Sequence, residues 1–511
     1  LLKLKYYFYF TKDSALMNIK FIFQKYLFPF LLGAFSVLAF APYNFYPLIF
    51  ISIIGLLYIT NKKESANIKS FLFGSGFFII GIYWIYICLQ QFGGMPPLFA
   101  LISTLALCLF LALFFLPFSL FNQYKNNIFF IPAFFTLIEL LRSFIFTGFP
   151  WLSLGYTQVP NSPLIGYLPI LGIHGISFLV VLSSILIFRL FKKESNKLYL
   201  ITSFIILWGG GEYLKQIEWS KPIGKPVNTS LIQGNISQDK KWDINMINES
   251  LNHYQKLIIN SDASLIILPE TSMPIEFNKI PQSFMKKIKH HLTNNNAHII
   301  LGAIEKGFYN SAFLIEKDVK QVYRKNHLVP FGEFIPLKKY LGYVYKNWLN
   351  MPFNSLKRGQ KESVPLFYIN NLGYAINICY EDVFGNEIAW KSKYINEPNV
   401  LVNISNDAWY GKSIAAEQHL QISQARAIEN KKMMLRSTNT GVTAFIDKNG
   451  KVLKKLPQFT SGSLNHNIQG YTGFTPYMIF NNFPIYFLCI LILILNFITN
   501  KSTYFKNLFN K

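Results

Sequence analysis

Three side chains capable of acyl-transfer chemistry each end a short strand-like stretch in the middle of the chain. They are Glu270 and Cys379, which end the apolar stretches 264–270 and 375–379, and Lys325, which ends the short, more polar strand-like stretch 321–325. Short apolar stretches of this kind are typical of buried strands. A side chain at a strand end is held by a rigid sheet and still opens into a cleft. We therefore expect a carboxylate, an amine and a thiol to meet at one site.

A carboxylate, an amine and a thiol together could move an acyl group. A free thiol has a pKa of about 8.5, so a base must remove its proton during attack at neutral pH. Glu270 could accept that proton, and Lys325 could stabilise both the thiolate and the oxyanion of the intermediate. Each residue also has an ordinary interpretation: Cys379 as a buried hydrophobe, Glu270 as a helix-cap partner, and Lys325 as a surface charge.

The composition predicts a membrane protein. Hydrophobic residues make up 51% of the 511 residues, and charged residues only 14%. Soluble proteins carry about 25% charged residues. Three of the four cysteines lie in apolar runs, and no Cys or His spacing suggests a metal site or a disulfide framework.

Eight apolar runs approach the roughly 20 residues that cross a bilayer as a helix. They lie near residues 24–41, 47–60, 71–89, 97–121, 128–146, 165–190, 197–209 and 482–499. The intervening segments at 42–46, 90–96 and 147–164 contain no Lys or Arg, whereas the alternate segments are rich in them. This is the positive-inside pattern, and it predicts a cytoplasmic amino terminus. It also accounts for much of the +24 net charge without nucleic acid.

The predicted organisation has four parts: a possible start-site extension (1–16), a domain of seven spans (17–212), an extracytoplasmic catalytic domain (213–475), and a final span with a cytoplasmic tail (476–511). The segment Gly209–Gly211 is expected to end the seventh span. In the catalytic domain, strand-like stretches alternate with helix-like ones, which favours an α/β domain with layered sheets. The expected strands include 230–232, 264–268, 298–303, 375–378, 400–404 and 443–446, and the expected helices 244–260, 281–293 and 415–434.

Several longer motifs surround the reactive residues. They are 233–236 with Trp242, 268–272, 323–333 (YRKNHLVPFGE), 378–382 (ICYED), 403–411 (NISNDAWYG) and 435–441, together with 141–142, 147–151 (TGFPW) and 154–156 in the apolar part. In these motifs the chain resembles the nitrilase superfamily, whose members use a Glu-Lys-Cys triad. More closely it resembles the apolipoprotein N-acyltransferase family, over nearly all of its length except residues 1–16.

The resemblance implies a multi-pass membrane domain joined to a nitrilase-like α-β-β-α sandwich. It implies Glu270 as general base, Lys325 as oxyanion stabiliser and Cys379 as nucleophile. It also implies supporting or substrate-binding roles for further residues, namely Trp242, Glu333, Tyr380, Glu381 and Trp409.

The implied reaction is two-step transfer of a fatty acyl chain. The donor is a phospholipid, and the acceptor is the amino-terminal diacylglyceryl cysteine of an apolipoprotein. No cofactor or metal is expected. The implied location is the bacterial inner membrane with the catalytic domain on the periplasmic side, and we expect a monomer.

Other features leave choices open. The aromatic segment 340–351, including Trp348, could face the lipid or form a buried helix. Glu139 and Arg142 are expected to pair on one helix face, with lipid head-group binding as a second possibility, and His174 is expected to pack. Two other functions remain: a tethered amidase that uses water as acceptor, and a transporter or scaffold with an inactive domain.

Overall fold

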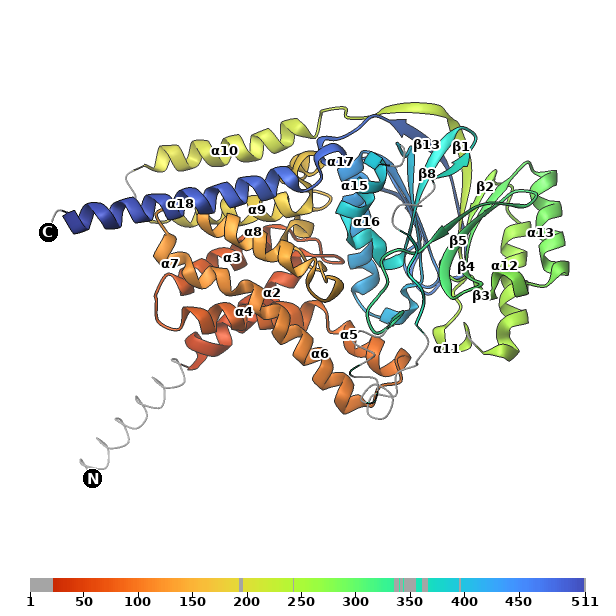
Figure 1. The fold of residues 1–511 in the computed structure, drawn as a ribbon, viewed down its shortest axis with the longest axis horizontal. Coiled ribbons are helices and arrows are strands. Elements are labelled where there is room, and N and C mark those ends of the chain that lie inside the picture. The colour runs from red at the N-terminus through yellow and green to blue at the C-terminus, as the bar shows by residue number, and fades with distance from the viewer. Residues whose placement is uncertain are drawn as a thin grey trace, which may run out of the picture.

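The computed structural model describes residues 22–192, 196–241, 243–334, 355–360, 366–394 and 397–509, together with Tyr340 and Tyr343. A bundle of apolar helices forms one part of the molecule, and two stacked sheets flanked by helices form the other (Figure 1).

The first sheet has seven strands in the order β13-β1-β2-β4-β5-β6, and β3 also pairs with β4. The strands are β13 (Gly462–Thr472), β1 (Lys221–Gln233), β2 (Leu265–Ile267), β4 (His298–Glu305), β5 (Tyr309–Ile315), β6 (Val319–Arg324) and β3 (Met273–Glu276). The central strands β1, β2 and β4 run parallel. As a result, the carboxyl ends of β2 and β4 lie at the same edge.

The second sheet has six strands in the order β12-β11-β10-β9-β8-β7. They are β12 (Val452–Lys455), β11 (Ala444–Ile446), β10 (Met433–Thr438), β9 (Val400–Ser405), β8 (Leu372–Ile378) and β7 (Phe367–Ile369). Strands β8, β9 and β10 are parallel and fully buried. Near-continuous apolar sequence is typical of strands covered on both faces.

Helices cover the outer face of each sheet. Side chains from both sheets form one core between them, including Leu231, Ile267, Ile376 and Val402. Helices α12 (Ile247–Ile259) and α13 (Gln282–Asn294) pack on the first sheet, and α15 (Gly385–Tyr394) and α16 (Ala415–Asn430) on the second. The predicted α-β-β-α sandwich is confirmed.

Each of the eight predicted apolar runs contains a helix, but most of these helices are short. The main ones are α2 (Phe28–Ser36), α3 (Pro47–Thr60), α4 (Ala66–Gly81), α5 (Trp84–Ile87), α6 (Pro97–Ala112), α8 (Phe130–Arg142), α9 (Leu168–Leu190), α10 (Lys197–Leu214) and α18 (Phe483–Phe509).

Only part of the predicted span count is supported by helix length. Within the described chain, the continuous helices Pro97–Tyr124 and Pro163–Leu190 are long and apolar enough to cross a membrane. A third span is possible if Ala66–Gly81 and Trp84–Phe92 count together, since they are bent by 50°. The apolar helices Phe23–Ala39, Pro47–Thr60 and Phe483–Thr499 are shorter. The count of eight spans therefore stays a prediction.

Two predicted boundaries are wrong. The helix expected over 415–434 ends at Asn430, and Met433 already begins strand β10. Lys431 between them has φ +49°, a left-handed conformation that stops the helix. The glycines at 209–211 do not end a helix either, because α10 continues to Leu214. Gly211 instead allows close packing, since a Cβ there would lie 2.6 Å from the Pro163 carbonyl oxygen.

Helix α16 joins the sandwich to the helix bundle through polar side chains. Gln418 Oε1 accepts hydrogen bonds from the indole nitrogens of Trp84 (3.3 Å) and Trp151 (2.8 Å), and its Nε2 donates to Gly81 O (3.2 Å). Gly81 is the last residue of α4. Since unpaired main-chain groups are costly in an apolar bundle, Gln418 stabilises the break between α4 and α5.

Two more side chains of α16 bind at other breaks in the bundle. Gln421 Oε1 accepts from the Ala41 amide at 3.2 Å, just beyond the first helical segment. Glu429 Oε1 accepts from the Ile173 amide at 3.1 Å, directly after Gly172, which interrupts α9 with φ +66°. The sandwich therefore completes the hydrogen bonding of the bundle.

Replacing Gln418 with Leu should destabilise the whole chain. The change leaves two buried indole N–H groups and one carbonyl without their partner, at a cost of about 1–3 kcal/mol each. We expect the midpoint of thermal unfolding in detergent to fall by more than about 2 °C. The exposed Gln282 of α13 offers a matched control, and Gln282→Leu should leave the midpoint unchanged. Equal midpoints for both variants would contradict the bridging role.

Candidate active site

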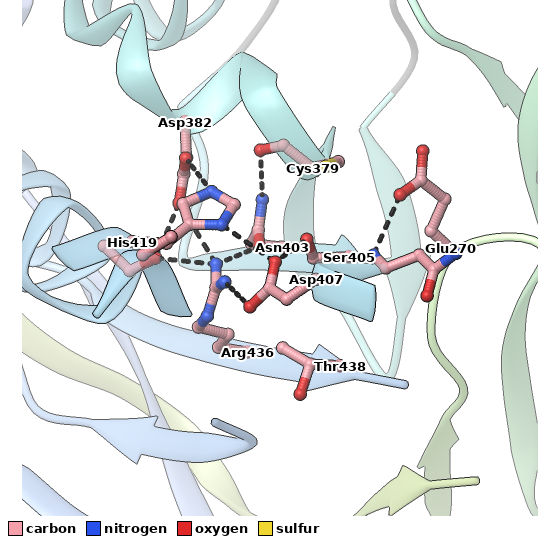
Figure 2. Close-up of polar contacts among 12 residues, drawn as sticks. Glu270, Cys379, Asp382, Asn403, Ser405, Asp407, His419, Arg436 and Thr438 are labelled. Atoms are coloured by element: carbon pink, nitrogen blue, oxygen red, sulfur yellow. Dashed lines mark hydrogen bonds and ion pairs between the residues drawn. The ribbon is translucent and has the colours of Figure 1, made fainter. Parts of the chain in front are cut away.

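Cys379 follows β8 at a sharp turn into a short helix, Cys379–Val383. Its φ is +53°, a left-handed conformation that is rare for residues other than glycine. The buried strand before it and the helix after it hold this strained geometry, which is common at reactive residues. The side chain is 7% exposed. In Figure 2 the sulfur end of Cys379 points toward the side on which Glu270 lies.

Glu270 lies three residues beyond β2 and is held at both carboxylate oxygens. Its Oε1 accepts from Asn310 Nδ2 (2.7 Å) and Lys325 Nζ (3.2 Å), and its Oε2 accepts from the Asn406 amide (2.9 Å). Asn406 follows β9, in the opposite sheet. Glu270 therefore spans the gap between the two sheets at the edge where Cys379 lies.

Lys325 is the residue after β6, and its side chain is 1% exposed. Its Nζ donates to Glu270 Oε1 and, at 2.9 Å, to Glu333 Oε1. Glu333 Oε2 also accepts from the Val329 amide at 2.8 Å. The predicted residues Glu270, Lys325 and Glu333 are thus directly connected.

Asn310, at the start of β5, was not identified from the sequence. Its Nδ2 donates to Glu270 Oε1 at 2.7 Å and to Glu333 Oε1 at 2.9 Å. It therefore separates two carboxylates that would otherwise repel each other. A single Asn in a strand does not reveal this role in the sequence. The role arises only in the fold, which brings Asn310 next to Glu270 and Glu333.

The charges at the site favour a neutral thiol beside an ionised carboxylate. Burial and the nearby Glu270 raise the pKa of Cys379, against the opposite effect of Lys325. Burial alone would raise the pKa of Glu270, but Lys325 and the hydrogen bond from Asn310 bring it below its usual value. Burial disfavours the ammonium of Lys325, yet Glu270 and Glu333 raise its pKa overall. An attack by Cys379 on a carbonyl would therefore require loss of the thiol proton, and an ionised Glu270 could receive it.

Glu381 connects the chain segments that carry Lys325 and Cys379. Its Oε1 accepts from the amides of Asn326 (2.7 Å) and His327 (3.1 Å). Its Oε2 accepts from Tyr323 Oη and the Ile378 amide, both at 2.7 Å. The carboxylate therefore fixes the end of β6 against the end of β8, which sets the distance between the amine and the thiol.

Tyr380 and His327 connect the active site to the helix bundle. Tyr380 Oη donates to Gly148 O at 3.0 Å, and His327 Nε2 donates to Thr147 O at 3.0 Å. Both carbonyls belong to the loop after α8. This loop therefore lies against the segments on both sides of the reactive residues.

The expected pairing of Glu139 with Arg142 is present, but their main contacts are with this loop. The pair is 3.7 Å apart. Arg142 Nη1 donates to the carbonyls of Phe149 (3.1 Å) and Trp151 (2.6 Å), and Glu139 Oε1 accepts from the Leu154 amide at 2.9 Å. Both ions are buried and hold the loop that touches Tyr380. His174 Nδ1 lies 3.4 Å from Glu139 Oε2, so it joins the same group.

The other predicted residues fall in different places. Trp409 is partly buried and packs against the bundle, with its ring centre 6.1 Å from that of Phe92. Trp242 lies outside the described residues, and so do Trp348 and most of the segment 340–351. Tyr340 and Tyr343, the described members of that segment, are 77% and 72% exposed.

A second buried polar group supports the Cys379 turn and was also missed (Figure 2). Asn403 Nδ2 donates to Cys379 O at 3.1 Å, and Arg436 Nη1 donates to Asn403 Oδ1 at 2.6 Å. Arg436 Nη2 donates to Asp407 Oδ2 at 2.8 Å. Asn403 lies in β9, Arg436 in β10, and Asp407 in the short helix Asp407–Tyr410 that follows β9. Together they support the main chain of the Cys379 turn.

His419 of α16 completes this group. Its Nδ1 lies 3.0 Å from Asp407 Oδ1 and its Nε2 2.8 Å from Asp382 Oδ1. Burial and Arg436 oppose protonation, but the two carboxylates outweigh them and raise the pKa of His419. Two carboxylates then face a guanidinium and an imidazolium, which balances charges that are costly to bury alone.

Among the residues that the structure describes, no three His, Cys, Asp or Glu side chains form a group that could hold a metal ion. The expectation that the chain needs no cofactor stays a prediction.

The sandwich and the site define the class of protein: an enzyme of the carbon-nitrogen hydrolase type joined to apolar helices. The carbon-nitrogen hydrolase model matches residues 228–477, and the model for the apolipoprotein N-acyltransferase N-terminal domain matches residues 32–186. Over 48% of its length, the chain is also similar to the crystal structure of the C. elegans NitFhit protein, covering 61% of that chain at 16% identity. The TM-score of 0.38 is too low to define the fold by itself.

Two relatives that match nearly the whole chain show the family to which it belongs. It is 39% identical to an apolipoprotein N-acyltransferase of Nitrosomonas europaea, over 91% of this chain and 95% of the relative. It is 35% identical to an apolipoprotein N-acyltransferase of Haemophilus influenzae, over 95% of this chain and 97% of the relative. The chain belongs to the apolipoprotein N-acyltransferase family. It is therefore an acyltransferase of the nitrilase superfamily.

Glu381→Gln should strongly impair acyl transfer. In either orientation, the new amide N–H group faces a main-chain N–H donor, so the connection between β6 and β8 opens. Misplacement by about 1 Å can cost about 10²-fold in rate, and we expect a loss of that order with the chain still folded. Exposed Glu249 supplies the control, because Glu249→Gln should retain full activity. Full activity of Glu381→Gln would show that this connection is not needed.

The neutral thiol predicts a distinctive pH response of Cys379. Because its pKa is raised, only a small fraction is thiolate at pH 7, and this fraction grows about tenfold per pH unit until the raised pKa is reached. Alkylation by iodoacetamide, followed by mass spectrometry of the Cys379 peptide, should still be accelerating at about pH 9.5, where an unstructured cysteine peptide has levelled off. A plateau of the Cys379 rate below about pH 8 would contradict the raised pKa.

Proposed function

We propose that the chain transfers a fatty acyl chain from a membrane phospholipid to the amino-terminal amine of an apolipoprotein through a thioester on Cys379. The observation that carries the proposal is the convergence at one buried edge of a strained cysteine turn, an ionised Glu270 and a charged Lys325. The similarity to apolipoprotein N-acyltransferases supports an apolipoprotein as the acceptor.

In the first step, Cys379 Sγ attacks the ester carbonyl of the phospholipid while Glu270 takes the thiol proton. Lys325 stabilises the oxyanion of the tetrahedral intermediate, a contribution typically worth about 10²–10³ in rate for such donors. The C–O bond then breaks, and Glu270 returns the proton to the departing glycerol oxygen. The products are a thioester and a lysophospholipid.

In the second step, the neutral α-amine of the acceptor's diacylglyceryl cysteine attacks the thioester carbonyl. The C–N bond forms and the C–S bond breaks. Glu270 takes a proton from the nitrogen and delivers it to the sulfur, which restores the neutral thiol. An amide is more stable than a thioester, so no nucleotide is needed.

The proposed setting is the bacterial inner membrane. Residues 17–212 and 476–511 would form eight spans in all, with the catalytic domain 213–475 in the periplasm. The distribution of Lys and Arg supports this orientation. Helices α10 and α18 support contact with lipid, because apolar side chains such as Leu198, Ile206, Phe487 and Phe497 are more than half exposed. We further propose a monomer that acts without nucleic acid.

The decisive experiment incubates the purified full-length chain with phospholipid alone and measures its mass. A single acyl group should appear on Cys379, resist washing, and leave when neutral hydroxylamine is added. Adding a diacylglyceryl lipopeptide should transfer the group to the peptide amine.

The control for this experiment compares two cysteine variants. Cys379→Ala should form no adduct, whereas Cys88→Ala, which changes a cysteine of the bundle, should form it normally. Transfer activity without a Cys379 adduct would refute the thioester route. Release of free fatty acid in place of an N-acyl peptide would favour an amidase-like enzyme that uses water.

A further inference from the structure

A second buried lysine contacts the turn that carries Glu270. Lys241 ends the short helix α11 (Gln238–Lys241) and is 3% exposed. Its Nζ donates to the main-chain oxygen of Glu270 (3.2 Å) and to Thr271 Oγ1 (2.6 Å). Both partners lie in the turn that carries the general base of the proposed reaction.

We propose that Lys241 is a positioning residue for acyl transfer: it holds the Glu270–Thr271 turn in place and supplies the second positive charge that keeps Glu270 ionised. The proposal rests on the role of Glu270 in the proposed function. Two independent features of the structure support it.

The first feature is the strain in the turn. Thr271 has φ +44°, and β-branched residues rarely adopt this left-handed conformation. Such a conformation costs roughly 1–3 kcal/mol and persists only where the surroundings enforce it. On one side the turn lies against Gly302, where a Cβ would come within 2.8 Å of Glu270 Cα. On the other side Lys241 binds both the Glu270 carbonyl and the Thr271 hydroxyl, so the turn is held from two directions.

Helix α11 also reaches Glu270 by a second route. Gln238 Oε1 accepts from Asn406 Nδ2 at 2.8 Å, and the Asn406 amide donates to Glu270 Oε2 at 2.9 Å. One turn of helix therefore fixes the main chain of Glu270 through Lys241 and its carboxylate through Asn406. Loss of the Lys241 contacts would free the main-chain side of this arrangement.

The second feature is the charge balance. Glu270 and Glu333 are both buried or nearly so and share one ammonium group, that of Lys325. Two carboxylates and one ammonium would leave a net negative charge in a site with little solvent. Lys241 adds the fourth charge and makes this group neutral, which removes a cost that unpaired buried ions carry. When the thiol proton moves to Glu270, the negative charge moves from the carboxylate to the sulfur, and the net charge of the site stays the same.

The titration of Lys241 agrees with this role. Burial lowers the pKa of Lys241 to about 8, against the opposite effects of Glu270 and Cys379. At neutral pH the side chain is therefore still mostly protonated, and its charge acts on both the base and the nucleophile. Without that charge, the carboxyl of Glu270 would bind a proton more readily.

The test compares Lys241→Met with Lys241→Arg in the full-length chain in detergent. The rate of Cys379 acylation by phospholipid is measured from about pH 3.5 to 9.5 in single-turnover experiments, so that the range includes the ionisation of Glu270. In the unaltered chain the rate rises as Glu270 ionises. In Lys241→Met this rise should shift upward by about one pH unit or more, so the rate relative to that of the unaltered chain should fall about tenfold on the acidic side of the rise and least at higher pH. Lys241→Arg should keep the original position of the rise, since its charge remains.

A merely structural role would give a different pattern. Lys241→Met would then lose activity equally at every pH, or both variants would shift alike, and either result overturns the proposal. So does a Lys241→Met profile that matches the unaltered chain. Iodoacetamide alkylation of Cys379 gives a second readout that needs no acyl donor, and Lys241→Met should slow it at pH 8. If the unaltered chain forms no acyl adduct, the proposed function fails, while the alkylation result still decides whether Lys241 acts on the thiol.

Discussion

The structure of the site depends on one buried ammonium group held between two carboxylates. Lys325 has almost no exposed surface, and both Glu270 and Glu333 accept from it. Moving these ions out of water costs several kcal/mol each, so they are stable only with close partners and further hydrogen bonds. Asn310, Asn406 and the Val329 amide supply those bonds. The chemistry proposed for Cys379 depends on this arrangement, because the arrangement keeps the Glu270 carboxylate ionised near a neutral thiol.

Buried hydrogen bonds also connect the site to the helix bundle. Glu381 fixes the two strand ends that carry Lys325 and Cys379. Tyr380 continues from there to the loop after α8, which Arg142 holds from inside the bundle. Helix α16 forms a second route: His419 supports the Cys379 turn on one face, and Gln418 binds the bundle on another. The Cys379 thiol is therefore fixed with respect to the helix bundle.

Local sequence was sufficient for much of this architecture. The predicted strands at 230–232, 264–268, 375–378 and 400–404 are present, because short apolar stretches of β-branched residues fit a buried sheet. The triad could be predicted because Glu270 and Cys379 end such stretches, Lys325 ends a short strand-like one, and the surrounding motifs resemble a known family. Asn310, Lys241, Arg436 and His419 were missed, since their role arises from partners far away in sequence. The helix end at Asn430 was not predicted from the sequence. The residue with the left-handed conformation there is Lys431, and no glycine or proline marks this position. The number of spans could not be derived from apolar runs alone, because several of the helices are broken or shorter than a full crossing.

The contacts of α16 also have a consequence for the order in which the chain matures. The bundle residues Ala41, Gly81 and Ile173 are synthesised more than 200 residues before the side chains that pair with them. During that interval the broken helices carry main-chain groups with no permanent partner, in surroundings that offer little water. The bundle becomes complete only after the catalytic part has emerged and docked. A nascent chain arrested before α16 is thus an unfinished membrane protein, open to recognition by the proteases that remove such intermediates.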